Sequence, residues 1–335
     1  MALQNKTGLY YPSQTLGPEI DVEEVIFSQT VISRVLHGYI GIMVPLGLLS
    51  GITILAIIIR KKIRHQTMEN LDFYLLSVAV TDLTIILYSF TAITRPSYME
   101  ITNLACGAIS TLFNVSYFTT QDLLLLMFFT MVAPNSSMLS SLLTTVNQNR
   151  LATMSVTVLF SILMSLLAAS LLGTHKELHT TTFCQLDPLN AKPEYDLVKF
   201  TAGFCFPTLL TLLLLLLLVY QLRRAEDSTV KENIQTQKAT LLHVAIMFVC
   251  RLFYNVMLIR RASLKLCVLS MSAREELLFN AAELVVFSGS SLNLIFTLTF
   301  HGPCRLGVWK ALHFLKKLCC KSQTYDGVEM HSSTK

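Results

Sequence analysis

Residues 36–59 read LHGYIGIMVPLGLLSGITILAIII, and the basic run RKKIR follows directly at positions 60–64. An α-helix rises about 1.5 Å per residue, so roughly 20 apolar residues cross the hydrocarbon core of a bilayer. Lys and Arg collect on the cytoplasmic side of short connections between spans. This stretch therefore predicts a transmembrane helix whose end at Ile59 lies at the inner face of the membrane.

Six further apolar stretches of similar length follow, divided by short polar loops. Apolar residues make up 53% of the chain and charged residues only 14%, and the mean hydropathy is +0.56. These values lie far from those of an ordinary soluble domain. The predicted fold class is all-α, an integral membrane bundle of seven transmembrane helices. The predicted spans are Leu36–Ile59, Leu71–Ile93, Cys106–Val132, Leu151–Leu172, Leu197–Leu222, Thr240–Ile259 and Leu277–Phe300.

The loops predict which end of the chain lies outside the cell. An odd number of spans puts the two termini on opposite sides, and the RKKIR cluster favours an extracellular N-terminus. Asn5, in the motif Asn-Lys-Thr, is an N-glycosylation acceptor in this outer tail. The sequence thus divides into an extracellular tail (1–35), the bundle (36–300), an interfacial helix (301–318) and a cytoplasmic tail (319–335).

Two cysteines fall on the predicted outer side. Cys106 begins the third span, and Cys184 lies in the long loop before the fifth. An oxidising compartment allows a disulfide between them, whereas the alternative is two unpaired thiols. Cys267, in the last outer loop, has no evident partner.

Several of these features together resemble one receptor family. The second span contains SVAVTDL at Ser77–Leu83, the fifth contains Pro207, and a basic amphipathic segment follows the seventh. With the cysteines of the third span and the second outer loop, the chain resembles the divergent members of the rhodopsin-like (class A) G-protein-coupled receptors. The resemblance implies a plasma-membrane receptor that passes an extracellular ligand signal to a heterotrimeric G protein or arrestin.

Three motifs of that family are altered. The position of the Asp-Arg-Tyr switch carries Thr130, Met131 and Val132, so the ionic latch from the third span to the sixth cannot form. The sixth span reads CRLF at Cys250–Phe253 and has no Pro to cause a kink. The seventh reads NLIFT at Asn293–Thr297 in place of Asn-Pro-x-x-Tyr. These departures favour an alternative, a non-signalling scaffold or regulator of other receptors.

Asp82 is a charged residue near the middle of the second span. A charge in hydrocarbon costs at least ~2.5–3.5 kcal/mol on translocon scales and must find a partner or a cavity. The resemblance places four polar residues around it, as in the hydrated sodium pocket of related receptors, and a hard cation prefers oxygen ligands of this kind. The other interpretation is an Asp that only ties helices together. The four residues are Ser116, Thr120, Ser290 and Asn293.

Arg251 and Glu283 lie at matching depths in the predicted sixth and seventh spans, roughly 9–12 Å from their outer ends at the helical rise. A charge-assisted pair there would satisfy both groups. In the family this layer holds the ligand, so the pair could recognise an anionic or zwitterionic group; the alternative is a closed ion pair that fixes helix packing.

The resemblance adds Phe113, where amine receptors carry an Asp, and so disfavours an amine ligand. Asp122 receives no role.

The end of the chain predicts contact with the inner leaflet. Residues 302–317 alternate apolar and basic side chains, which is typical of an interfacial helix. Cys319 and Cys320 follow as candidate palmitoylation sites, with two reduced thiols as the alternative. Membrane lipid is therefore an expected partner.

Other function classes lack their sequence signals. A transporter would be expected to carry paired internal repeats, broken helices or charged rings along a pore, and none is found. No span carries a nucleophile with a base, or a paired carboxylate set, at helical spacing, so no enzyme, metal site or cofactor beyond a bound sodium ion is expected. No nucleic-acid partner is expected either.

Overall fold

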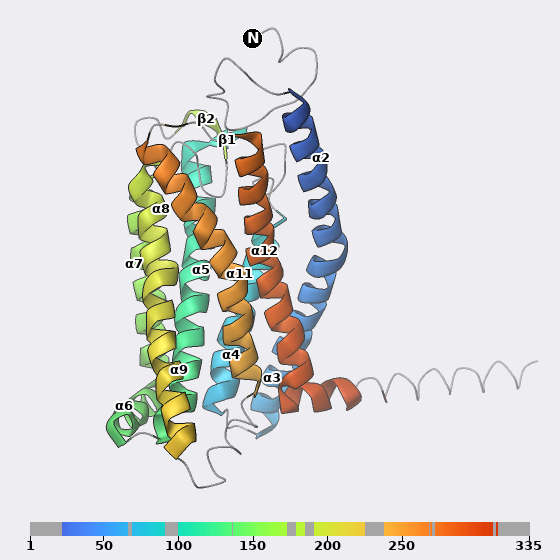
Figure 1. Ribbon diagram of the computed structural model, residues 1–335. Helices are drawn as coiled ribbons and strands as arrows, with labels where there is room; N and C mark the ends of the chain where they lie inside the picture. Colours follow the sequence, from blue (N-terminus) through green and yellow to red (C-terminus); the bar gives the residue numbers. More distant parts are fainter. Residues whose placement is uncertain are drawn as a thin grey trace, which may run out of the picture.

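The computed structural model describes residues 22–65, 69–90, 100–135, 137–172, 179–184, 191–224, 238–267, 269, 272–310 and 313. Seven helices in this part of the chain are long and apolar enough to cross a membrane, which confirms the predicted number of spans. They stand side by side as a bundle (Figure 1). Asn5, Cys319, Cys320 and most of both predicted tails lie outside the described residues.

Two of the seven helices are interrupted by a π-helical turn and the other five are continuous. The first span consists of α2 (Val22–Gly38), η1 (Tyr39–Met43) and α3 (Val44–His65), and the fifth of α8 (Pro193–Phe200), η4 (Thr201–Cys205) and α9 (Phe206–Arg224). The continuous helices are α4 (Asn70–Tyr88), α5 (Asn103–Val132), α7 (Arg150–Ser170), α11 (Lys238–Leu266) and α12 (Ala273–Phe300). Shorter elements are β1 (Glu100–Thr102), the 3₁₀ turn Ala133–Asn135, α6 (Ser137–Gln148) and β2 (Thr181–Phe183).

The first helix begins at Val22, well before the predicted start at Leu36, so much of the expected N-terminal tail is helical. Its early turns bury one face through positions 25, 28, 32 and 36, the three- and four-residue spacing of a helix that packs along one side. Val25 packs against Ala273, at the start of α12. Because positions 22–34 include many polar residues, a search for long apolar stretches did not detect this part of the helix.

Small residues allow the first helix to approach its neighbours closely. A Cβ atom on Gly47 would lie 2.6 Å from the Ser291 hydroxyl of α12, and one on Gly51 would lie 2.6 Å from Leu83 of α4. Glycines four residues apart on one helix face permit this kind of helix contact in a membrane. The first helix is thereby held against both α4 and α12.

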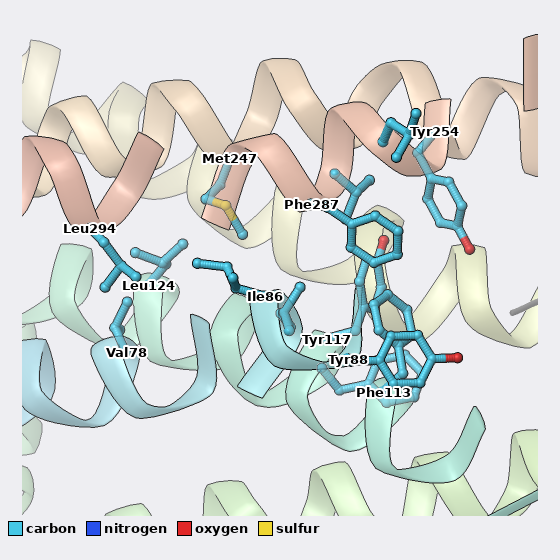
Figure 2. Packing of buried hydrophobic residues seen from close by; sticks show 14 of the residues in the cluster. Val78, Ile86, Tyr88, Phe113, Tyr117, Leu124, Met247, Tyr254, Phe287 and Leu294 are labelled. Atoms are coloured by element: carbon cyan, nitrogen blue, oxygen red, sulfur yellow. The ribbon is translucent and has the colours of Figure 1, made fainter. Parts of the chain in front are cut away.

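The centre of the bundle is formed mainly by α5 and α12, whereas α7 and the α8–α9 helix lie at its edge. About two thirds of the most apolar window of α5 is buried (67%), compared with 17% for α7. Aromatic rings from three helices meet in the core, where Phe113 packs against Tyr88, Tyr117 and Phe287 (Figure 2). Most side chains of α7 therefore remain available to lipid.

One end of the bundle, which we call the disulfide end, is closed by Cys106–Cys184. The bond joins the first turn of α5 to the residue that follows β2, as predicted. Strands β1 and β2 pair antiparallel beside it, with Glu100 opposite Phe183. The disulfide end also carries the start of α12, where Ser272 and Glu275 form a capping box.

The opposite end, which we call the His301 end, contains the turn after α12. Residues 302–310 are helical and run away from the bundle in Figure 1. A Cβ atom on Gly307 would lie 2.7 Å from Ile57 of α3, so this segment packs against the first helix. Leu306 and Trp309 are 59% and 69% exposed. Placement of this helix on a leaflet stays a prediction.

Candidate functional site

Asp82 lies at the centre of the bundle on α4 and is fully buried, with 0% of its surface exposed. Asn293 of α12 donates from Nδ2 to Asp82 Oδ2 over 3.4 Å. Asp82 Oδ1 has no hydrogen-bond partner, and neither have Asn293 Oδ1 and the hydroxyl of Ser290. The structure thus brings together three of the five residues predicted for the sodium pocket, with hydrogen bonds left unmade.

The other two predicted residues, Ser116 and Thr120, lie on α5. The Thr120 hydroxyl donates to the backbone carbonyl of Ser116 over 2.8 Å, so its proton is used within the helix. Among the five residues of the predicted pocket, the buried oxygens without partners belong to Asp82, Ser290 and Asn293, and the one from Asp82 is a carboxylate oxygen. This donor set fits a hard cation, which those three residues would hold.

Arg251 of α11 is buried among these groups, with 1% of its surface exposed. Its Nη1 donates to the backbone carbonyl of Tyr117 over 2.9 Å, and its guanidinium carbon lies 4.0 Å from the centre of the Tyr117 ring. Its Nε and Nη2 have no hydrogen-bond partner. The carboxylates that act on it electrostatically are Asp82 and Asp122.

The predicted hydrogen-bonded pair of Arg251 with Glu283 is therefore wrong. Equal depth on neighbouring helices placed both residues in one layer, but the guanidinium of Arg251 is directed to α5 and stacks on Tyr117. Glu283 is buried on α12 and interacts with other groups. A helical depth count fixes the level of a side chain and leaves its direction open.

Asp122, for which no role was predicted, links two helices. Ser161 of α7 donates to Asp122 Oδ2 over 3.4 Å. Asp122 is also within the electrostatic reach of Arg251. We call Asp82, Asp122, Arg251, Ser290 and Asn293 the central layer.

Phe113 contributes to an aromatic box around a buried lysine that sequence reasoning missed. The ammonium of Lys199, on α8, lies 4.9 Å from the centre of the Phe113 ring, and its surface is 0% exposed. The rings of Tyr117, Tyr195 and Tyr254 lie at 5.5, 5.8 and 5.3 Å. Cation–π attraction strengthens where the cation is removed from water.

A second missed group lies next to this box, toward the disulfide end. Asp196 of α8 is 1% exposed and pairs with two cations of α11, Arg261 and Lys265, the latter over 2.8 Å. We call these three residues the Asp196 cluster. The predicted fifth span began at Leu197, so Asp196 was assigned to a loop. Pro193 at the first helical position was the available signal that the helix begins earlier.

The His301 end is joined by a different set of contacts. Asp72 of α4 accepts from Lys61 over 2.7 Å and lies 2.8 Å from His301 Nε2, so one carboxylate connects α3, α4 and the turn after α12. His243 and Thr297 share a hydrogen bond of 2.9 Å between α11 and α12. These bonds fix the ends of four helices relative to one another.

The altered switch positions lie at this end of α5. Met131 and Val132 are buried and pack with Leu218 of α9. Gln221 of α9 donates to the Val132 carbonyl over 3.3 Å, and the Thr130 hydroxyl donates back to Met127. The end of α5 is thus held to α9 by apolar packing and one neutral hydrogen bond.

Comparison of the chain with protein-family models and with curated proteins finds no match.

Proposed function

We propose that this chain is a multi-pass receptor of the plasma membrane, of the rhodopsin-like class of G-protein-coupled receptors, with its disulfide end and its N-terminus outside the cell. In this proposal an extracellular ligand changes the packing of the seven helices. The His301 end passes that change to a heterotrimeric G protein or to arrestin. The molecule has no enzymatic activity in this account.

One observation carries the proposal, a stripe of buried polar residues along α12. Glu276, Glu283, Ser290 and Thr297 follow one another at seven-residue intervals, and all are buried. Seven residues are almost two helical turns, so these side chains lie on one face. Polar groups at membrane depth are expensive, and by default they mark a functional pathway. A stripe that runs from one end of the bundle to the other supports transmission between the two faces.

The arrangement at the disulfide end supports a ligand with charged groups. Lys199 supplies a buried cation there, and Glu283 supplies a buried carboxylate. Charges of both signs beside aromatic rings suit an anionic or zwitterionic ligand. Phe113, Arg251 and Glu283 remain our proposed ligand-binding residues. Arg251 would respond to the ligand through its contacts with Tyr117.

A second candidate function, a scaffold that regulates other receptors, is favoured by the contacts of Val132. Outward movement of the sixth span in a receptor requires that a latch be released, and here Val132 is fixed to Gln221 of α9 by a neutral bond. Among the described residues, the end of α5 has no ion pair to α11 and therefore no charged latch for a transducer to open. Such a bundle would bind partners through a fixed shape.

The experiment that separates these functions measures cAMP, calcium and arrestin recruitment in cells that express the full chain. Two variants each remove one negative charge. Glu283→Gln removes a charge from the polar stripe of α12, and Asp82→Asn removes the charge of Asp82, which lies beside this stripe on α4. Glu194→Gln makes the same chemical change as Glu283→Gln at an exposed position and serves as the matched control. Surface amounts are equalised by an extracellular epitope tag.

A receptor gives a change in at least one channel relative to untransfected cells, and Glu283→Gln reduces that change while Glu194→Gln does not. If every channel matches untransfected cells at equal surface amounts, the receptor proposal fails and the scaffold is favoured.

A further inference from the structure

We propose that Arg251 is the built-in cation of the Asp82 site, so that its guanidinium neutralises the Asp82 carboxylate and makes a bound sodium ion unnecessary in the resting protein. The inference concerns ion selectivity within the bundle. It does not depend on signalling, and its test uses purified protein.

Backbone contacts hold Arg251 beside the Asp82 site from two sides. Its neighbour Cys250 packs so closely on α12 that a Cβ atom on Gly289 would lie 3.0 Å from the Cys250 Cβ. Gly289 directly precedes Ser290, whose hydroxyl lies near the Asp82 carboxylate but does not meet the geometry of a hydrogen bond. On the other side Arg251 donates to the carbonyl of Tyr117. The native glycine allows α11 to approach α12 closely at this point, and Arg251 and Asp82 act on each other electrostatically.

The hydrogen bonds left unmade on the two residues are complementary. Arg251 has two buried donors without partners, Nε and Nη2. Asp82 Oδ1, Ser290 Oγ and Asn293 Oδ1 are buried oxygens without partners in the same layer. The Nε–Nη2 edge of a guanidinium is one that can bind a carboxylate through two parallel bonds. Donors and acceptors that lack partners are thus present in one electrostatically coupled group.

Of the two carboxylates near Arg251, Asp82 is the one that needs the cation. Asp122 already accepts a hydrogen bond from Ser161, and its side chain is only partly buried. Asp82 is completely buried and has an oxygen with no partner. A buried charge without a counter-charge is the costlier arrangement, so the electrostatic demand on Arg251 comes mainly from Asp82.

Sodium and the guanidinium would then compete for the same carboxylate. A positive charge fixed in the protein raises the energy of bringing a second cation to the site, and it does so strongly in a region without water. The Arg251 guanidinium is covalently attached to the chain, so its concentration at the Asp82 site does not depend on the salt in solution. Removal of the Arg251 charge should open the site to sodium.

The test measures thermal unfolding of the full chain in detergent, in sodium chloride and in N-methyl-D-glucamine chloride at equal ionic strength. Four proteins are compared, namely wild type, Arg251→Gln, Asp82→Asn and the double variant. A ligand that binds only the folded state raises the melting temperature with its concentration. We expect no difference between the two salts for wild type, a rise of several degrees in sodium for Arg251→Gln, and no rise for the two proteins that lack Asp82.

Two results would overturn the proposal. One is a sodium-dependent rise in wild type that Asp82→Asn abolishes, since Arg251 would then not have replaced the ion. The other is an Arg251→Gln protein that unfolds at the same temperature in both salts.

If Arg251→Gln does not fold, the double variant tests whether Arg251 is the counter-charge of Asp82. Loss of both charges removes the unpaired carboxylate, so the double variant should recover folded yield in either salt. A double variant that stays unfolded while Asp82→Asn alone folds would show that Arg251 does not serve Asp82.

Discussion

Two buried charge groups of this bundle, the Asp196 cluster and the central layer, differ in how completely their polar atoms are partnered. In the Asp196 cluster each carboxylate oxygen faces a cation, one from Arg261 and one from Lys265. In the central layer Arg251 has two donors without partners, and Asp82 has one oxygen without a partner. Both groups are buried, but only in the Asp196 cluster does every carboxylate oxygen have a partner.

The difference separates a structural role from a switching role. A fully paired cluster is costly to break, so the Asp196 cluster fixes α8 against α11. A group with unmade hydrogen bonds gains by rearrangement or by taking up water or an ion, so the central layer is where a second arrangement would cost least.

Replacement of Asp196 by Asn should be the most damaging single change, because it leaves Arg261 and Lys265 without their carboxylate. Loss of one partner from a buried ion pair costs about 3–5 kcal/mol. We expect loss of surface expression and of a cooperative melting transition in detergent. Glu275→Gln is the matched control, since its partner Arg260 is exposed, a pair of that kind contributes about 0–1 kcal/mol, and Gln preserves the capping box. Equal damage from both variants would contradict a structural role for the cluster.

The disulfide should come next. Cys106→Ser releases a crosslink between residues 78 positions apart in the sequence, and loss of a native disulfide typically costs about 2–5 kcal/mol. We expect a lower melting temperature that dithiothreitol reproduces in wild type and leaves unchanged in the variant. Further destabilisation of the Cys106→Ser protein by dithiothreitol would contradict this assignment.

Asp82→Asn should be milder than Asp196→Asn. Asn can still accept from Asn293, and Arg251 keeps both its bond to Tyr117 and the nearby charge of Asp122. A hydrogen bond to a charged group is worth about 1.5–3 kcal/mol, so we expect a loss at or below that range and a folded protein at the cell surface. Melting curves of the two variants, measured side by side, decide the order. Unfolding of Asp82→Asn at a lower temperature than Asp196→Asn would invert the comparison.

The smallest effect concerns Cys304, where we expect slow alkylation of the thiol and no change in stability. Burial and the nearby Asp72 charge raise the pKa of this thiol to about 12, although Lys61 acts in the opposite direction. The protonated form therefore dominates at neutral pH, and alkylation should be slow until the pH approaches that value. Mass spectrometry after iodoacetamide treatment at pH 7 and at pH 9 measures this, with the exposed Cys267 as the reactive reference. Rapid modification of Cys304 at pH 7 in the folded protein would contradict its burial.

Hydrophobic length was sufficient to predict the number of spans, and the outer placement of Cys106 and Cys184 was sufficient to predict the disulfide, but hydrophobic length failed at the helix ends. Residues 36–59 alone exceed the length needed for a span, so the count did not depend on boundaries. At Val22 and Pro193 the helices continue into polar sequence, where amphipathic packing replaces hydrophobic length. Asp196 was missed for this reason, whereas Lys199 lay inside the predicted span but was given no role.

The candidate site was predictable in its level along the bundle but not in the direction of its side chains. Asp82 and Asn293 are close together as expected, because the resemblance supplied a pairing as well as a depth. Arg251 and Glu283 were matched by depth alone, and Arg251 contacts Tyr117 instead. Which neighbour a helical residue faces depends on the rotation of each helix, and that is set by packing such as the Gly289–Cys250 contact.

The proposed function assumes that the helices cross a membrane with the disulfide end outside. The most direct test labels intact cells with a membrane-impermeant maleimide and locates the modified cysteine by mass spectrometry. Native Cys267 should be labelled on intact cells, whereas position 62 of a Lys62→Cys variant should be labelled only after permeabilisation. Labelling of position 62 on intact cells, or protection of Cys267 until the membrane is opened, would contradict the account.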